Sequence, residues 1–257
     1  MVFMMCLLTV CSLFGLATGM AQSLPDSLPD LQGYRIDILT PDDVIEYSYT
    51  TSMRIDRDLA QITIAATGPS YQSKSVYDLS FLLLSSELEV RAKDDIERIG
   101  FDRRTAFIDI EVDRLVLEFF LEQESQQIRE HDIPTETVDI ESLGLYLQSL
   151  VLAGETTFHG NLYDSNSGDK FNRLQVSLLK QSEIDKLVRQ STFPETMNVM
   201  LKDSDNIIVF SLGLRGLIRI FFPHRFYVVL EKQAPHHILG FWGGSSQRLR
   251  YHVYQKL

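Results

Sequence analysis

The stretch Thr105-Ala-Phe-Ile-Asp-Ile-Glu-Val-Asp-Arg-Leu-Val-Leu-Glu-Phe-Phe120 decides the fold class of this chain. Its first half alternates between a mostly acidic face, beginning at Phe107, and an aliphatic face, beginning at Ile108. A period of two is typical of a strand that buries one of its faces. A polar break at Asp113-Arg114 then leads into a second apolar run. The pattern predicts a β-hairpin with a tight turn, whose first strand has a solvated acidic face.

Runs of the same kind recur on both sides of this hairpin, separated by turn-forming residues such as Gly68-Pro69. We expect earlier strands at Tyr34–Leu39, Glu46–Ile55, Leu59–Ala66, Tyr77–Leu84 and Leu88–Ala92. We expect later strands at Thr156–Tyr163, Phe171–Leu179, Asn198–Lys202, Ile207–Leu212, Leu217–Phe222, Phe226–Lys232, Ile238–Trp242 and Gln247–Tyr254. Many short strands without an internal repeat predict a mainly β protein, in which an antiparallel sheet curves into a barrel or half-barrel.

One amphipathic helix interrupts the strands after Asp139, which is a candidate N-cap. Gly154 is a candidate residue for ending this helix. Apolar side chains recur between them with the spacing of one helix face, at Leu143, Tyr146, Leu147, Leu150 and Val151. Because the helix is isolated among strands, we expect it to lie across the concave face of the curved sheet. A short polar helix or turn is expected over Ser182–Gln190.

The N-terminal segment Met1–Ala21 has the character of a secretory signal peptide. It contains no charged side chain, and it closes with Gly19-Met20-Ala21, which supplies the small residues that signal peptidase needs. We predict a cleaved signal peptide over 1–21, a linker over 22–33 and a single β-barrel-like domain over 34–257, with a periplasmic or secreted location. An uncleaved N-terminal anchor is the alternative, although the apolar stretch is short for a membrane span.

The sequence offers no motif for catalysis or for a cofactor. Both cysteines, Cys6 and Cys11, lie in the predicted signal peptide, so the mature chain would have no disulfide and no thiolate chemistry. The chain has no Gly-x-Ser-x-Gly elbow and no His-Glu-x-x-His motif. His236 and His237 are adjacent, so on one strand they would point to opposite faces. We therefore expect no cofactor, metal or assigned catalytic residue, and a hydrolase without a recognisable motif stays as an alternative.

The net charge of −11 is unevenly distributed along the chain. The acidic whole argues against nucleic acid as a partner. After Asn206, by contrast, Glu231 is the single acidic residue among several basic ones. This basic quarter suits an anionic ligand, a membrane surface or an envelope protein, or else it pairs with the acidic half of the chain. The candidate contacts are Arg215, Arg219, Arg248 and Arg250.

Aromatic residues gather on the predicted strands and at their ends. Most of them would form core, but a curved sheet that does not close tightly leaves an apolar cavity, which is the usual site for a hydrophobic ligand. We expect such a cavity to be lined by Leu143, Tyr146, Leu147, Leu150, Phe158, Phe221 and Trp242.

The order of elements also resembles a known group of proteins. The helical stretch Asp139–Gly154 is followed by Phe158-His-Gly-Asn-Leu162 and then by Asp169-Lys-Phe-Asn-Arg-Leu-Gln-Val176. This succession resembles uncharacterised bacterial periplasmic β-barrel proteins of a domain-of-unknown-function family, in which a short helix precedes strands of this kind. The last strands, with Pro223 between two of them, are similar as well.

More distantly, the architecture looks like the LolA/LolB lipoprotein carriers, half-barrels in which a curved sheet shelters acyl chains. The predicted export, the period-two pattern, the amphipathic helix and the many aromatic residues lead us to expect a non-enzymatic envelope protein that binds a lipid, a lipoprotein acyl chain or another apolar ligand. Two other hypotheses stay open. One is an envelope scaffold with a filled barrel that docks a partner on its basic surface. The other is an outer-membrane barrel, although the chain ends in Gln255-Lys256-Leu257 and not on an aromatic residue.

Overall fold

A computed structural model of the chain describes residues 24–109, 114–134, 136–163, 171–191, 193–203, 205–214, 226–243 and 250–257, apart from the side chains of Gln190, Leu214 and Arg250. The predicted signal peptide at 1–21 and the predicted strand Leu217–Phe222 lie outside these ranges.

The first half of the described chain is an antiparallel meander in which each strand pairs with the next. Its strands are β1 (Leu31–Leu39), β2 (Ile45–Asp56), β3 (Gln61–Thr67), β4 (Tyr71–Asp78), β5 (Leu83–Val90), β6 (Arg103–Asp109), β7 (Arg114–Leu121) and β8 (Glu124–Asp132). The pairing of β6 with β7 runs from Arg103 opposite Phe120 to Asp109 opposite Arg114. The hairpin predicted from this stretch is therefore confirmed.

The second half adds seven strands to the same sheet. They are β9 (Thr137–Asp139), β10 (Thr157–Tyr163), β11 (Phe171–Leu178), β12 (Ile207–Leu214), β13 (Phe226–Glu231), β14 (Ile238–Gly243) and β15 (Arg250–Lys256). β9 and β10 are parallel, and the other neighbours are antiparallel. β15 pairs with β1, which joins the halves into one fifteen-stranded sheet with β8 and β9 at its ends.

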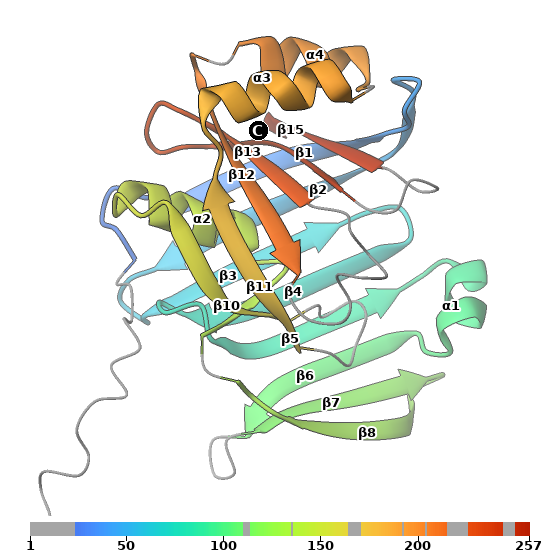
Figure 1. Cartoon of the computed structure of the whole chain (residues 1–257). Coiled ribbons are helices and arrows are strands. Elements are labelled where there is room, and N and C mark those ends of the chain that lie inside the picture. The colour runs from blue at the N-terminus through green and yellow to red at the C-terminus, as the bar shows by residue number, and fades with distance from the viewer. Residues whose placement is uncertain are drawn as a thin grey trace, which may run out of the picture.

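This sheet is strongly curved, and it does not close (Figure 1). The end strand β8 approaches the other end of the sheet at β11, two strands in from β9, since the ring centroids of His131 on β8 and Phe171 on β11 lie 6.4 Å apart. No pairing among the described residues links β8 to β9. The predicted mainly β fold, an antiparallel sheet curved into a barrel-like form, is confirmed.

Four helices lie in the described part of the chain, namely α1 (Lys93–Ile99), α2 (Leu143–Leu152), α3 (Gln181–Gln190) and α4 (Glu195–Lys202). The sequence predicted α2 and α3. It missed α1, and the strand predicted at Asn198–Lys202 is wrong because this segment is part of α4. Met197 and Leu201 are four residues apart and both buried, which is the spacing of a helix face. None of the helices in the described ranges is long and apolar enough to cross a membrane.

Helix α2 is buried over most of its surface. Its N-cap is Ser142. The prediction of Asp139 as the N-cap is therefore wrong. Gly154 follows the helix with a φ of 76°, the left-handed conformation that glycine adopts most easily, so its predicted role is confirmed. The buried side chains include the polar Gln148 and Ser149 beside four of the five predicted apolar ones, and the fifth, Val151, is partly buried. Ser149 Oγ donates to the carbonyl of Tyr146 at 2.7 Å, which satisfies its hydroxyl inside the core.

The curved sheet has a core on each of its two faces. On the concave face, α2 packs against strands from both halves of the sheet. On the convex face of β12–β15, α3 and α4 cover a second core (Figure 1). A single strand contributes side chains to both cores, because its residues alternate between the two faces of the sheet. On β13, Val228 and Leu230 lie in the concave core and Val229 lies in the convex core.

The segment before β1 is more ordered than a linker. The predicted linker at 22–33 extends into the sheet, because β1 begins at Leu31. Leu24 and Leu28 are buried in the concave core. The guanidinium of Arg57 holds the segment through the carbonyls of Pro25 and Leu28, at 3.3 and 3.1 Å. The apolar side chains in this short polar stretch thus act as anchors.

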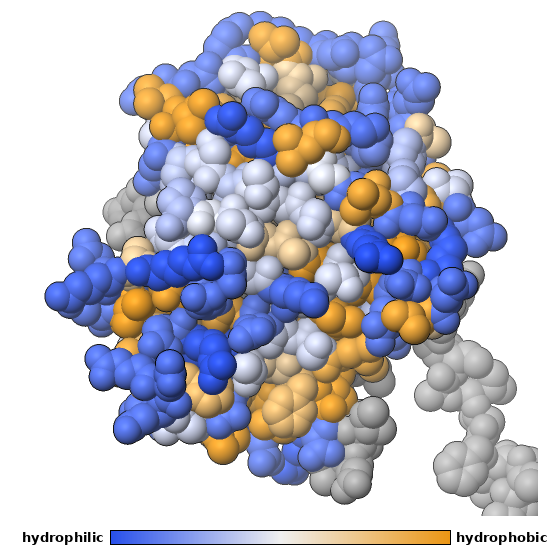
Figure 2. Space-filling model, turned by 180° about the vertical axis from the view of Figure 1, so that it is seen from behind, coloured by the Kyte–Doolittle hydropathy of each residue, from blue (hydrophilic) through white to orange (hydrophobic). Residues whose placement is uncertain are grey.

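The outer surface is mixed in character. Seen from behind, hydrophobic residues form several separate groups between hydrophilic ones (Figure 2). Scattered apolar side chains of this kind are ordinary for a protein surface.

Candidate functional site

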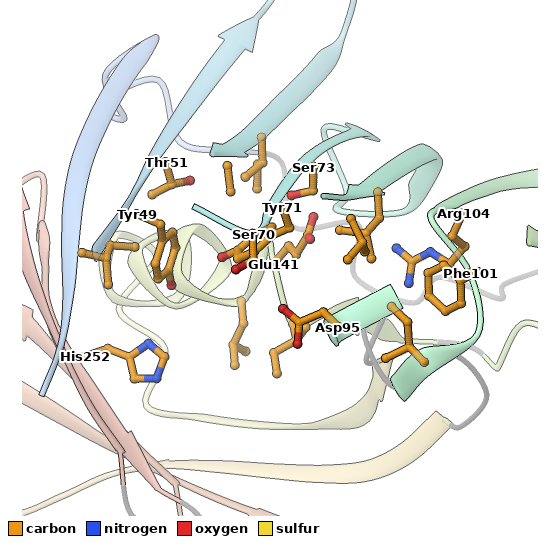
Figure 3. A pocket seen from close by; sticks show the side chains of 18 of the residues that line it. Tyr49, Thr51, Ser70, Tyr71, Ser73, Asp95, Phe101, Arg104, Glu141 and His252 are labelled. Carbon is orange, nitrogen blue, oxygen red and sulfur yellow. The ribbon is translucent and has the colours of Figure 1, made fainter. Parts of the chain in front are cut away.

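A cavity of about 740 Å³ lies inside the curved sheet, and we regard it as the candidate functional site (Figure 3). Strands β1–β8 and β13–β15 contribute to its wall, together with α1 and the start of α2. Its volume falls within the range of about 300–1,000 Å³ that is usual for small-molecule sites. The apolar side chains of this wall include Ile36, Met53, Ile64, Leu88, Val228 and Ile238.

The inward positions of β2, β3 and β4 form a continuous part of the wall. Ala66 on β3 lies opposite Thr51 on β2 and Ser73 on β4, and all three side chains line the cavity. The next residue, Ala65, lies opposite Ser52 and Lys74, which are exposed on the outer face. Alternate residues of these strands therefore face the cavity and the solvent, so the sheet here is the only layer between the two.

A polar group of tyrosines and one carboxylate lies near α2. The rings of Tyr49 and Tyr71 have centroids 6.0 Å apart, and both line the cavity with Tyr254. Burial raises the pKa of Tyr49 and Tyr71 well above the usual range and that of Tyr254 to about 12. These phenols are therefore neutral near pH 7 and can act as hydrogen-bond donors. Ser75 Oγ donates to Oε2 of Glu141, which also lines the cavity, at 2.5 Å.

Arg104 on β6 lines the cavity at the other end of the view in Figure 3, where it lies beside Phe101. Its side chain is buried, with 1% of the residue exposed. The atoms Nε, Nη1 and Nη2 have no hydrogen-bond partner within the described chain. Its neighbours across the sheet are Leu88 on β5 and Phe119 on β7, and both are apolar.

Exposed residues complete the wall near α1 and β8. Arg98 and Asp95 of α1 form an ion pair with 2.6 Å between Nη2 and Oδ1. Gln126 and Gln127 of β8 are exposed and line the same cavity. This side of the cavity therefore meets the solvent.

The residues predicted to line a cavity are distributed over several places. Leu143 does line it. Tyr146, Leu147, Leu150 and Phe158 pack in the concave core but do not belong to the cavity wall, and the rings of Tyr146 and Phe158 lie 5.0 Å apart. Trp242 lies in the convex core, under α3 and α4.

The predicted anionic-surface contacts and one aromatic residue fall outside what the structure describes. Arg215, Arg219, Arg248 and Phe221 lie outside the described residues. Arg250 is the first residue of β15, where it is opposite Gly243, but its side chain is not described.

Sequence reasoning missed Tyr49, Tyr71, Glu141 and Arg104 as wall residues. A signal for Arg104 was present, because it has the same parity along its strand as Ala106 and Ile108, on the face predicted to be aliphatic. A charged residue on a buried face is rare unless it has a partner. The tyrosines carried no such signal, because tyrosine is common on strands whatever its role.

The adjacent histidines are both engaged in the fold. His237 Nδ1 lies 3.0 Å from the hydroxyl of Tyr34, and its Nε2 lies 3.0 Å from Nζ of Lys256. His236 Nδ1 lies 3.1 Å from the carbonyl oxygen of Glu231. Within the described ranges, no group of three or more His, Cys, Asp or Glu side chains is placed to hold a metal ion.

Comparison with known proteins adds a likeness of shape. No protein-family model and no curated protein matches the chain. A β-barrel-like protein of a domain of unknown function (DUF1849) from Brucella abortus is similar over 89% of this chain and 96% of that chain, with a TM-score of 0.49 and 10% identity. The DNA polymerase III subunit beta from Borrelia burgdorferi, solved with a natural product, aligns over 91% of this chain and 60% of its own, with a TM-score of 0.16 and 8% identity.

Neither likeness is close enough to carry an argument about function. The class of protein follows from the chain itself, as an open, curved antiparallel sheet with four described helices and an internal cavity.

Proposed function

We propose that this chain is an exported, non-enzymatic protein of the cell envelope that binds a lipid, a lipoprotein acyl chain or another apolar ligand in the cavity of its curved sheet. The observation that carries the proposal is the cavity of about 740 Å³, whose wall is largely made of inward-facing apolar side chains. Removing an acyl chain from water into such a site stabilises the complex by about 0.8 kcal/mol for each buried CH₂ group.

The cavity also favours this proposal over that of a scaffold with a filled interior. Protein interiors are close-packed, and voids much larger than a water molecule are few. A volume of several hundred cubic ångströms is therefore better explained by a ligand than by imperfect packing. The distant resemblance of the architecture to the LolA/LolB lipoprotein carriers is part of this proposal, because those half-barrels shelter acyl chains.

Binding can be tested with a pair of variants on one strand. Ala66→Phe places a ring in the cavity, between Thr51 and Ser73, whereas Ala65→Phe places the same ring on the outer face, between Ser52 and Lys74. A fluorescent fatty acid, 11-(dansylamino)undecanoic acid, serves as the probe. We expect wild type and Ala65→Phe to bind it alike, and Ala66→Phe to bind at least about 10-fold more weakly, a change of about 1.4 kcal/mol.

Thermal unfolding of the three proteins controls for folding. Lipid extraction and mass spectrometry of the wild type purified from its host would show a co-purifying lipid. The ligand part of the proposal is overturned if the wild type carries no lipid and does not bind the probe. It is also overturned if both phenylalanine variants bind like the wild type.

Export is tested separately. Cleavage after Ala21 would leave Gln22 as the first residue of the protein isolated from its host. N-terminal sequencing that instead finds an intact N-terminal segment, on protein recovered with the cytoplasm, would contradict export.

A further inference from the structure

The buried arginine of the cavity wall identifies the kind of ligand in more detail. Arg104 is 1% exposed, and none of its three side-chain nitrogens has a hydrogen-bond partner in the described chain. A guanidinium is charged at all physiological pH values and carries five N–H donors. A buried charge without a partner is strongly unfavourable, so such a group in a cavity wall is suited to pairing with an anionic ligand.

The sequence places Arg104 inward by the same alternation that builds the rest of the sheet. On β6, Arg104 and Ala106 are buried, whereas the alternate residues Arg103 and Thr105 are partly exposed. Arg104 lies between Leu88 and Phe119 on the neighbouring strands. The ring of Phe101 packs edge-on against Phe119 with centroids 5.1 Å apart. In such apolar surroundings, an ion pair with a ligand is stronger than it would be in water.

The acidic side chains of the cavity are engaged elsewhere. Glu141 accepts a hydrogen bond from Ser75, and Asp95 is paired with Arg98. A further cation lies on the same side as Arg104, because Arg129 also lines the cavity, with its guanidinium carbon 4.9 Å from the ring centroid of Phe119. This end of the cavity is therefore basic, although the chain as a whole has a net charge of −11.

The two ends of the cavity differ in what they can bind. In Figure 3, Arg104 and Phe101 lie at one end, Tyr49 and His252 lie at the other, and Glu141 lies between them. The carboxylate of Glu141 would repel an anion placed near it, whereas the basic end would attract one. A long ligand would thus have a defined direction in the cavity.

We propose that the ligand is an anionic amphiphile, with one acyl chain against the apolar wall and a carboxylate or phosphate head group paired with Arg104. This inference rests on the proposed function, since it requires that the cavity holds an apolar chain. The planar fork of the guanidinium matches either head group with two parallel hydrogen bonds, so the shared chemistry is that of an oxyanion.

Three probes with the same chain length test the head group at pH 7.5. They are palmitate, 1-palmitoyl-lysophosphatidate and hexadecanol, each measured by displacement of the dansyl fatty acid. We expect the wild type to bind at least one of the two anions about 10-fold to 100-fold more tightly than hexadecanol, the range for a hydrogen bond to a charged group. The anion that binds more tightly identifies whether a carboxylate or a phosphate is preferred.

Arg104→Met should bind all three probes with the affinity that the wild type has for hexadecanol. Because it replaces an unpaired buried charge with an apolar side chain of similar length, it should fold at least as well as the wild type. Arg103→Met is the matched control. Arg103 lies over the ring of Phe120 at 4.2 Å, outside the cavity wall, so its loss should leave the preference for anions unchanged.

The inference is overturned if the wild type binds hexadecanol as tightly as both anions, or if Arg104→Met keeps the preference. The comparison of probes on the wild type alone tests whether the ligand is anionic, even if a variant fails to fold. Failure of the proposed function gives a different result, because then the wild type would not bind the dansyl probe in the first place.

Discussion

Gln32 on β1 and Gln148 on α2 form a reciprocal pair of amide hydrogen bonds inside the concave core. Nε2 of Gln32 donates to Oε1 of Gln148 at 3.2 Å, and Nε2 of Gln148 donates to Oε1 of Gln32 at 3.3 Å. Both side chains are buried. The pair joins the first strand of the sheet to the helix whose N-terminal residue, Leu143, lines the cavity.

Gln148→Leu should lower the free energy of unfolding by about 1–3 kcal/mol, because it leaves the buried amide of Gln32 without one of its partners. Urea or guanidinium unfolding, followed by far-UV circular dichroism, measures the change. The double variant Gln32→Leu/Gln148→Leu is the control, since removing both polar groups should recover part of the loss. Additive losses in the double variant would show that the pair is not coupled.

The hydrogen bonds continue from Gln32 to the end of the chain. The Tyr34 hydroxyl donates to Gln32 Oε1 at 2.7 Å and lies 3.0 Å from Nδ1 of His237. Nε2 of His237 lies 3.0 Å from Nζ of Lys256, which can only donate. Nε2 is then the acceptor of a neutral imidazole, and Nδ1–H donates to the oxygen of Tyr34. The arrangement requires an unprotonated His237.

Unfolding free energy should therefore depend on pH through His237. Burial, and next the positive charge of Lys256, lower the pKa of His237 in the folded state, while the negative charge of Glu231 opposes them. In the unfolded state the pKa returns to about 6.5. The unfolded state then binds more protons in the window below pH 6.5, so stability is complete above that pH and falls as the pH is lowered through it.

The matched variant is His237→Gln, which cannot titrate. We expect the stability difference between wild type and variant to shrink from pH 8 to pH 5, measured by denaturant unfolding at each pH. Subtracting the variant removes the contribution of the other five histidines of the sequence. A difference that is constant over this range would show that His237 does not change its protonation on unfolding.

The sequence predicted the curved sheet because period-two alternation depends on local contacts that every strand repeats. The prediction was weaker where tertiary packing overrides that pattern. The strand expected at Tyr77–Leu84 spans a turn, in which Asp78 Oδ1 accepts from the backbone N–H of Ser80 and Leu82. The buried ring of Phe81 in that turn, at a φ of 68°, made the apolar run look continuous.

The placement of Trp242 shows the same limit at the candidate site. Ile238 and Trp242 have the same parity, so a regular strand would point both into the cavity. The pairing of β13 with β14 shifts register at Val229/Leu230, where Leu230 is opposite Ile238 and Val229 is opposite Gly240. This β-bulge turns Trp242 to the convex core and Phe241 to the cavity. A bulge depends on the partner strand and is not visible in the pattern of one strand.

The two neighbouring aromatic residues should therefore respond differently to the same substitution. Trp242→Leu removes the stacking on Tyr227, whose ring centroid is 4.8 Å away, and should lower stability by about 1–3 kcal/mol without changing affinity for the dansyl probe. Phe241→Leu removes apolar area from the cavity wall and should weaken probe binding. Thermal unfolding and probe titration of both variants measure the two effects. Weaker binding by Trp242→Leu alone would place the ligand against the convex core instead.

The parallel strand at the end of the sheet depends on a glycine. Gly160 on β10 is so close to the carbonyl oxygen of Glu136 and the ring of Phe158 that a methyl group at its Cα would clash with both. The same carbonyl accepts the N–H of Asn161 at 2.9 Å, next to the pairing of β10 with β9. Backbone cannot move aside as a flexible side chain can, so Gly160→Ala should destabilise the fold by about 1–3 kcal/mol.

Gly213→Ala is the matched control, because a Cβ there meets nothing within 4 Å, and alanine in a strand interior is favoured over glycine by about 0.5–1 kcal/mol. Denaturant unfolding of the two variants should give changes of opposite sign, and equal changes would show that β9 does not need the close approach at Gly160.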